Sequence, residues 1–359
     1  MYRKLVSFTK LTSHFPTIIF VFGFVFDAIM LPDLEDPIAR YIGCAYLFAI
    51  AFLIMFREWL VSRNTASLIE QRIYSLTTFG ISYFSGSALS FIFIYAVRSA
   101  QISVSWPLFL ILFLCILANE FVSTHNFRFM LDIGILLMAV LFYAIFNMPL
   151  ILKVQNDTTF GIAVAVTIVI SLIYIYLLKF SSENAYEQVG RGYALAFGIP
   201  MFVAMLYYLN VLPAVPLSLA NAGVYHGIVK NGDGEYIAQK ETDLRRFAQY
   251  RTPVYHLMPA DDGVYFFSAV NAPAELTAPI SYVWEKYDES KHIWIAIGSP
   301  ITFTLEGGRS EGYRGYSQKT RIDPGLWRVT VKVDNNRVIG RMKFQVVTGE
   351  VVPVNEVKL

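Results

Sequence analysis

The stretch GGRSEGYRGYSQKT, residues 307–320, brings four glycines, three basic residues, two tyrosines and two serines together. This composition fits an anion-binding loop, a catalytic loop built on a serine, or the turns of a β-domain. The stretch lacks the G-x-x-x-x-G-K-[ST] pattern of a phosphate loop and does not lead into a helical pattern. Ser310 and Ser317 have no neighbouring base that the sequence identifies. We therefore interpret the glycines as turn-formers and the cations as one edge of a binding surface.

The histidines of the C-terminal part do not belong to a catalytic or metal-binding motif. His226, His256 and His292 occur without HExxH, paired cysteine ligands or G-x-S-x-G. His256 follows TPVY in a predicted loop and His292 begins a predicted strand, so we expect each to be solvated or packed. We predict no catalytic residue, no metal site and no cofactor.

Basic residues are concentrated near the C-terminus. Residues 309–343 hold nine basic and three acidic side chains, whereas residues 216–308 hold seven basic and eleven acidic ones. This asymmetry predicts a positive flank that binds an anionic glycan, a lipid headgroup or an acidic partner protein. An equally weighted alternative is that exposed strand positions carry Lys and Arg to prevent edge aggregation. The predicted ligand-binding residues are Arg309, Arg314, Tyr316, Lys319, Arg328, Arg341 and Lys343.

Alternating apolar and polar residues predict strands throughout this part of the chain. The run LWRVTVKV places Trp327, Val329, Val331 and Val333 on one face. After the turn signal DNN, the run RVIGRMKFQVV predicts a hairpin partner with Val338, Met342, Phe344 and Val346 inward. Further strands are predicted in GVYHGIV, EYIAQ, GVYFFSAV, ISYVWEKY, HIWIAIG and ITFTLE, and a helix in ETDLRRFAQYR at 241–251. Residues 216–359 are thus predicted to form an all-β immunoglobulin-like sandwich.

The first 215 residues have the composition of a membrane domain. The whole chain is 55% hydrophobic and 16% charged, and its apolar residues are concentrated before about residue 215. Crossing a bilayer takes about 20 helical residues. Stretches near that length lie at 15–31, 40–57, 73–96, 104–119, 129–149, 159–179 and 192–212. We predict an α-helical transmembrane bundle of about seven helices over residues 1–215, with an interfacial helix in REWLVSRNTASLIEQR between the second and third spans.

Lysine and arginine are unevenly distributed between the two sides of this bundle. With the N-terminus inside, the inner segments carry nine of them and the outer loops three, so positive charge predicts a cytoplasmic N-terminus. An odd number of spans then places the C-terminal domain outside the cytoplasm. Membrane lipids are expected partners and nucleic acid is not. Cys44 and Cys115 both lie in predicted spans, so the outer domain is expected to lack disulfides.

Three polar residues inside the spans are default functional candidates, because ionisable groups are costly in a membrane. Asp27 lies near the outer end of the first span, whereas Asn119 and Glu120 end the fourth on the cytoplasmic side. They approach opposite faces and no polar chain joins them across any span. We expect Glu120 to be satisfied by Arg128 or by headgroups, and Asp27 by a neighbouring helix.

In the third span, small residues recur every four positions at Ser82, Gly86 and Ser90. This spacing lines them along one helix face and predicts close approach of another helix.

The segments VYFFSAVNAP, VWEKYDESKHIWIAIGSPITFTLEGGRSEGYRGYSQKT and PGLWRVTVKVDNNRVIGRMKFQVV together resemble a bacterial domain of unknown function, family twenty-nine fourteen. The resemblance covers about residues 264–347. Its matching positions are Trp284, Gly308, Arg309, Arg314, Tyr316, Ser317, Lys319, Gly325, Trp327, Arg328, Val329, Gly340 and Phe344. The resemblance implies a protein of the bacterial inner membrane with a β-rich periplasmic module, and it supplies no activity or substrate.

Three functional hypotheses follow. The leading one is a non-enzymatic envelope protein whose membrane anchor presents the basic β-domain to an anionic ligand or partner. The second is a membrane enzyme acting on a lipid-linked or cell-wall substrate at the outer leaflet, with Asp27 and LPDLEDP at its site. The third is a transducer that uses the seventh span, with Gly198 and Pro200, to couple the outer domain to a cytoplasmic partner.

Overall fold

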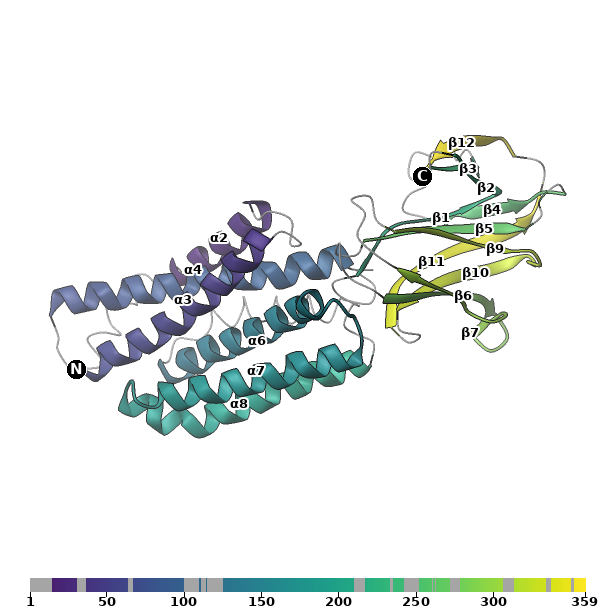
Figure 1. The fold of residues 1–359 in the computed structure, drawn as a ribbon. Coiled ribbons are helices and arrows are strands. Elements are labelled where there is room, and N and C mark those ends of the chain that lie inside the picture. The colour runs from purple at the N-terminus through teal and green to yellow at the C-terminus, as the bar shows by residue number, and fades with distance from the viewer. Residues whose placement is uncertain are drawn as a thin grey trace. The chain divides into compact units, whose positions relative to one another are not determined.

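The chain divides into two compact units (Figure 1), the first mainly residues 1–215 and the second mainly Pro216–Leu359. The computed structural model describes residues 15–30, 37–63, 67–99, 110, 114, 125–209, 217–232, 235–241, 252–259, 261, 263–271, 278–305, 313–333, 337–349 and 352–359.

The first unit is built from long apolar helices. Its described helices are α2 (Phe15–Met30), α3 (Pro37–Ser62), α4 (Leu68–Ser99), α6 (His125–Leu152), α7 (Asp157–Leu178) and α8 (Glu183–Tyr208). Five of them, α3, α4, α6, α7 and α8, are long and apolar enough to cross a membrane. The predicted helical membrane region is therefore confirmed in this coarse form. The predicted span at 104–119 lies outside the described residues except for Leu110 and Leu114.

The interfacial helix predicted over residues 57–72 is wrong. The first part of that segment continues α3 to Ser62, and the last part begins α4 at Leu68. Arg57 and Glu58 are 1% and 0% exposed, because they form ion pairs and hydrogen bonds with other helices of the bundle. Their charges made the segment look amphipathic, whereas the fold buries them.

Small residues on α4 let α2 approach closely, as the spacing of Ser82, Gly86 and Ser90 predicted. A side chain at Gly86 would collide with the carbonyl oxygen of Phe20 on α2, and one at Gly23 would collide with the carbonyl oxygen of Tyr83 on α4. Two glycines, one on each helix, therefore bring the two backbones together.

The helices α7 and α8 form an antiparallel pair with capped starts. The side chain of Asn156 accepts a hydrogen bond from the amide of Thr159, and Ser182 accepts one from the amide of Ala185. Each cap satisfies an amide that the first helical turn leaves without an intrahelical partner. The turn between the two helices is short and begins at Lys179.

The second unit is rich in β-strands, which confirms the coarse prediction for the C-terminal region. The strands are β1 (Ser218–Tyr225), β2 (Gly227–Lys230), β3 (Tyr236–Glu241), β4 (Val254–Leu257), β5 (Val264–Asn271), β6 (Ala278–Asp288), β7 (Ile293–Ala296), β8 (Ile301–Leu305), β9 (Tyr313–Lys319), β10 (Gly325–Val333), β11 (Arg337–Thr348) and β12 (Val354–Lys358). One three-stranded sheet has the order β1-β5-β9, and another has the order β12-β3-β2. A six-stranded sheet has the order β4-β11-β10-β6-β7, with β8 also paired to β6.

Side chains join the β1-β5-β9 sheet to the six-stranded sheet across a buried core. The indole nitrogen of Trp284 on β6 donates to the hydroxyl of Ser317 on β9 at 2.8 Å. The hydroxyls of Ser268 on β5 and Tyr282 on β6 lie 2.7 Å apart. These buried polar atoms are satisfied across the interface, and aromatic rings pack around them.

The predicted hairpin is confirmed, because β10 pairs antiparallel with β11 and Trp327 lies opposite Phe344. One detail was wrong. The register shifts so that Val331 pairs with Gly340 but Lys332 pairs with Val338, which places Val338 on the face opposite the core. Ile339 is buried instead, at 3% exposure. The extra residue of a β-bulge changes the alternation that the sequence pattern assumed.

The glycine-rich stretch 307–320 is only partly described, and the described part is not a turn. Tyr313–Lys319 forms β9, which pairs antiparallel with β5 along its whole length. A Cβ on Gly315 would lie 2.9 Å from the hydroxyl of Tyr282 and 3.2 Å from Phe303. This glycine therefore makes room for aromatic side chains of the facing sheet. The helix predicted at 241–251 lies outside the described residues except for Glu241, which ends β3.

Candidate functional site

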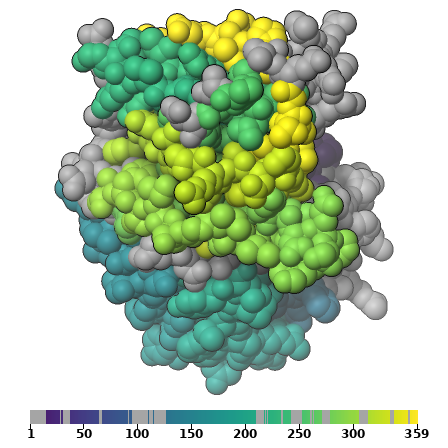
Figure 2. Space-filling view, turned by 90° about the vertical axis from the view of Figure 1, so that its right-hand side faces the viewer, coloured from purple at the N-terminus to yellow at the C-terminus, as the bar shows by residue number. Residues whose placement is uncertain are grey.

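The outer face of the six-stranded sheet carries a group of cations at its centre. Strand register places Arg328 opposite Lys343 and Thr330 opposite Arg341, on the face away from Trp327 and the core. On the other side of β10, Arg328 lies opposite Glu285 of β6. We call Arg328, Lys332, Arg341, Lys343 and Glu285 the basic face. Figure 2 shows atoms of this unit, in green to yellow, on the side that faces the viewer.

The single carboxylate of the basic face is fully engaged. Glu285 accepts hydrogen bonds from Nε and Nη2 of Arg328 at 2.6 and 2.7 Å, and from the hydroxyl of Thr330 at 2.5 Å. Burial opposes ionisation of Glu285, but these bonds and the charges of Arg328 and Lys332 hold its pKa below the ordinary value. Arg328 is therefore a structural partner of Glu285 more than a free ligand-binding residue.

The remaining cations of the basic face lie close to one another and to Arg328. Burial lowers the pKa of Arg341, the nearby charge of Arg328 lowers it further, and Glu285 offsets only part of this. Lys343 is exposed beside it, and Lys332 lies close enough to Glu285 to affect its ionisation. Four cations around one carboxylate leave a net positive potential on this face.

An aromatic edge borders these cations on β7. The guanidinium of Arg328 lies 4.3 Å from the ring centroid of Trp294, and Nζ of Lys343 lies 5.8 Å from it. The rings of Tyr287 and Trp294 are 5.2 Å apart. These cation–π contacts hold the long basic side chains over the sheet.

The other predicted ligand-binding residues do not join this face. Arg314 and Tyr316 lie on β9 in the other sheet, where Tyr316 is 45% exposed and packs against Tyr236 and Tyr265. Lys319 donates to the carbonyl oxygen of Ile297 at 2.8 Å. Arg309 lies outside the described residues. The structure thus gathers Arg328, Arg341 and Lys343, and separates Arg314, Tyr316 and Lys319 from them.

A second polar cluster surrounds His226 and was missed at the sequence level. Nδ1 of His226 lies 3.0 Å from both carboxylate oxygens of Asp261, and its Nε2 lies 3.0 Å from Oε1 of Glu241. Oε2 of Glu241 lies 2.7 Å from Nδ1 of His256, and Tyr255 donates to Asp261 at 3.1 Å. His256 lies on β4, so the predicted loop position is wrong. These residues are far apart in sequence, which is why no motif marked them.

The ionisation of this cluster predicts a bell-shaped stability profile. Burial opposes the charge of His226, but hydrogen bonds and charges from Glu241 and Asp261 raise its pKa above 6.5. The contribution of His226 to folding stability is present below pH 6.5 and is lost as the pH rises through the raised pKa of this histidine. Burial also opposes ionisation of Glu241, but bonds from His226 and His256 lower its pKa below 4.5. That contribution is present above pH 4.5 and is lost as pH falls.

We expect His226→Gln to remove the decline on the alkaline side and to lower stability most near pH 5–6. Denaturant unfolding of the full chain in detergent, followed by tryptophan fluorescence between pH 4 and 9, measures this. His292→Gln is the control, because His292 is exposed in a turn. An unchanged alkaline limb in His226→Gln would show that His226 does not titrate with folding.

The helical unit contains a buried cluster of four charges. Nη1 of Arg57 donates to Asp132 at 2.6 Å, and Nε of Arg128 lies 3.5 Å from the same carboxylate. Arg128 also donates to Ser82 at 3.0 Å. Glu58 accepts hydrogen bonds from Ser182 at 3.2 Å and Asn184 at 3.3 Å. The cluster joins α3, α4, α6 and the start of α8. Neither its pairing nor its depth was evident from sequence.

The predicted intramembrane residues have different outcomes. Asp27 is 3% exposed and accepts a hydrogen bond from Tyr46 of α3 at 3.2 Å, so α3 is the neighbouring helix that contacts it. Asn119 and Glu120 lie outside the described residues.

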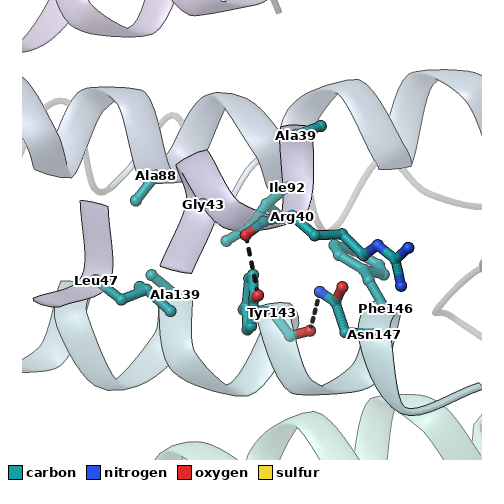
Figure 3. Close-up of a pocket in the computed structure, with 10 residues that line it drawn as sticks. All are labelled: Ala39, Arg40, Gly43, Leu47, Ala88, Ile92, Ala139, Tyr143, Phe146 and Asn147. Atoms are coloured by element: carbon teal, nitrogen blue, oxygen red, sulfur yellow. Dashed lines mark hydrogen bonds between the residues drawn. The ribbon is translucent and has the colours of Figure 1, made fainter. Parts of the chain in front are cut away.

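A small cavity lies between α3, α4 and α6 (Figure 3). Its volume is about 20 Å³, and its polar lining consists of Arg40, Tyr143 and Asn147. Tyr143 donates to the carbonyl oxygen of Arg40 at 3.0 Å, and Asn147 donates to that of Tyr143 at 2.8 Å. This volume suits about one water molecule and is too small for an organic substrate. Asp27 is not among its lining residues.

The basic face lies in a region that matches a known family. The model of a protein family of unknown function, DUF2914, matches residues 277–346, which include β6 to β10 and most of β11. The predicted resemblance is confirmed. All five residues of the basic face lie within this DUF2914 region.

Other comparisons add no functional information. None of the curated proteins matches this sequence. A solved structure, the alkylpurine DNA glycosylase AlkC of Pseudomonas fluorescens bound to DNA containing an abasic site analog, aligns over 88% of this chain and 99% of its own, with 10% identity and a TM-score of 0.21. A TM-score this low carries no argument about this protein.

Proposed function

We propose that this chain is a membrane-anchored, non-enzymatic binding protein whose basic face holds an anionic glycan. In this proposal a bundle of about seven helices anchors the chain in the bacterial inner membrane with its N-terminus in the cytoplasm. An immunoglobulin-like sandwich then presents the DUF2914 region in the periplasm. The apolar helices and the β-rich unit support this arrangement in outline.

The observation that carries the proposal is the excess of cations around Glu285. Four cations, Arg328, Lys332, Arg341 and Lys343, lie on the neighbouring strands β10 and β11, and Arg328 already occupies both oxygens of Glu285. Lys343 is exposed and Lys332 and Arg341 are half-buried, and cations grouped on a sheet attract carboxylate, sulfate or phosphate groups. The repulsion between Arg341 and Arg328 would be relieved by an anion.

The aromatic edge favours an acidic sugar polymer over the other anionic candidates. Trp294 and Tyr287 supply flat rings beside the cations, and tyrosine and tryptophan combine apolar area with a polar atom, as a sugar ring requires. A sheet face is also broad enough for an extended polymer. Lipid headgroups and acidic proteins are the alternative ligands that the binding test must distinguish from a glycan.

The test compares two pairs of substitutions with the same change in charge. Arg341→Gln with Lys343→Gln removes two cations from the basic face, whereas Lys230→Gln with Lys240→Gln removes two exposed lysines from the β12-β3-β2 sheet. We expect polygalacturonate to bind the full-length wild type in a salt-sensitive manner, and the first pair to weaken binding about tenfold or more. Thermophoresis of labelled protein in detergent measures this.

The control pair and the choice of ligand make the outcome specific. If the double variant Arg341→Gln with Lys343→Gln bound polygalacturonate as tightly as the wild type, the binding site would lie outside the basic face. Equal losses in both pairs would show only a general charge effect. Binding to phosphatidylglycerol vesicles without binding to polygalacturonate would overturn the glycan in favour of a lipid surface.

A further inference from the structure

An apolar groove runs along the outside of the α7–α8 pair. Its walls are Leu172, Ile173 and Tyr176 on α7 with Tyr193 and Phe197 on α8, and its volume is about 590 Å³. The groove is open along its length, so it can hold one side of an extended chain without enclosing it. The groove is lined almost entirely by carbon, so only an apolar chain matches its walls.

Close packing at one point shapes this groove. A Cβ on Gly192 would lie 3.0 Å from Ile175, so the absence of a side chain at Gly192 brings the two helices together. Around Gly190, by contrast, a Cβ would meet nothing within 4 Å. Gly190 and Tyr186 lie on the same face of α8 as Tyr193 and Phe197, toward the N-terminal end of the helix.

A cation stands at that end of the groove. Lys179 follows α7 directly, and its Nζ lies 3.8 Å from the ring centroid of Tyr176 and 4.8 Å from that of Phe180. Among the described residues, no carboxylate forms an ion pair with Lys179. Tyr176 thus belongs both to the groove wall and to the cation contact, which makes the two features continuous.

The nearest carboxylates of α8 are Glu183 and Glu187, which are both exposed. At about 100° per residue, Glu187 lies roughly 120° around the helix from Tyr193, whereas Glu183 lies within about 20° of Gly190, at the edge of the same face. In the described part of the chain neither carboxylate forms an ion pair with Lys179, whose amino group lies against Tyr176 at the end of the apolar groove.

We propose that this groove is a binding site for an anionic phospholipid. One acyl chain lies between Leu172, Ile173 and Phe197, and the phosphate lies against Lys179, with the hydroxyl groups of Tyr176 and Tyr193 at the boundary between the two. Three features follow one another along the pair: an apolar wall, tyrosines, and a lysine that has no acidic partner among the described residues. Tyrosine and lysine occupy these depths where helices leave the hydrocarbon.

The end of the pair that carries Lys179 is held in place. Glu58 of α3 accepts hydrogen bonds from Ser182 and Asn184, which lie immediately after the turn. The position of Lys179 relative to the groove is therefore set by the bundle before any lipid arrives, which lowers the ordering cost of binding.

The test measures lipid retention by the purified full-length chain with native mass spectrometry. Phosphatidylglycerol and phosphatidylcholine with identical acyl chains are the probes. We expect the wild type to prefer phosphatidylglycerol, and Lys179→Gln to reduce that preference about fivefold while leaving phosphatidylcholine retention unchanged. Ile173→Trp, which fills the groove from a 55% exposed position, is expected to reduce retention of both lipids.

The matched control is Arg63→Gln. The guanidinium of Arg63 lies 4.0 Å from the ring centroid of Trp59 near the end of α3, so it is also a cation stacked on an aromatic ring, but it does not line the groove. An equal loss of preference in Arg63→Gln and Lys179→Gln would overturn the site in favour of general surface charge. Displacement of phosphatidylglycerol by millimolar inorganic phosphate would also overturn it, because the ligand would then be a free anion. If Ile173→Trp retained both lipids fully, the acyl chain would not lie in the groove.

Discussion

Replacing Asp132 by Leu is expected to lower the free energy of unfolding of the helical unit by about 3–5 kcal/mol. Asp132 is 2% exposed and is the hydrogen-bonding carboxylate of Arg57, which is itself 1% exposed. Nε and Nη2 of Arg57 already lack hydrogen-bond partners among the described residues. Without Asp132 the buried guanidinium would retain Glu58, at 3.8 Å, as its one ion-pair partner in the described part of the chain.

This loss is measured by unfolding the protein in mixed micelles while the proportion of a denaturing detergent is increased. The double variant Arg57→Met with Asp132→Leu is expected to be more stable than Asp132→Leu alone, because it removes the uncompensated charge together with its partner. Glu187→Gln is the control on an exposed helix face and should change stability by less than about 0.5 kcal/mol. A loss no larger than that in Asp132→Leu would mean that water reaches Arg57.

The second large effect is expected from Glu285→Gln in the DUF2914 region. This change removes both charge-assisted bonds to Arg328 and weakens the bond from Thr330, so we expect a loss of about 2–3 kcal/mol in β-unit stability. Lys286→Met is the neighbouring control. Lys286 pairs with Asp323, which is 82% exposed, and such a pair contributes about 0–1 kcal/mol.

Glu285→Gln also separates stability from binding. The substitution raises the net charge of the basic face by one, so binding of polygalacturonate should tighten even though the fold is weakened. Chemical denaturation and thermophoresis on the same preparation give both values. Weaker binding by a fully folded Glu285→Gln chain would contradict an electrostatic role for the basic face.

Periodicity was sufficient to predict the elements with strong local patterns. Helical runs of apolar residues located five membrane-length helices, and alternation located the β10–β11 hairpin with Trp327 and Val329 inward. The alternation failed at Val338 because a bulge is a feature of the pair of strands and is not visible in one of them. It also missed β9, because Gly315 resembles a turn residue until the facing Tyr282 and Phe303 are known.

The polar clusters could not be predicted, because each depends on register between distant segments. Arg328 and Glu285 are 43 residues apart and meet only because β10 pairs with β6. His226 meets Glu241 and Asp261 through three different segments, and Arg57 meets Asp132 across 75 residues. Charge counting therefore identified a basic region but overestimated its free cations, since it treated Arg328 and Lys319 as unpaired.

The pairing of Glu58 with the start of α8 has a consequence for how the chain enters a bilayer. Ser182 lies 124 residues after Glu58, and Asp132 lies 75 residues after Arg57, so α3 is synthesised long before the groups that satisfy its two charges. During that interval both charges must remain in water or at the headgroups, and α3 cannot settle to its final depth. We therefore expect α3 to reach its final depth in the bilayer only after α8 has been synthesised.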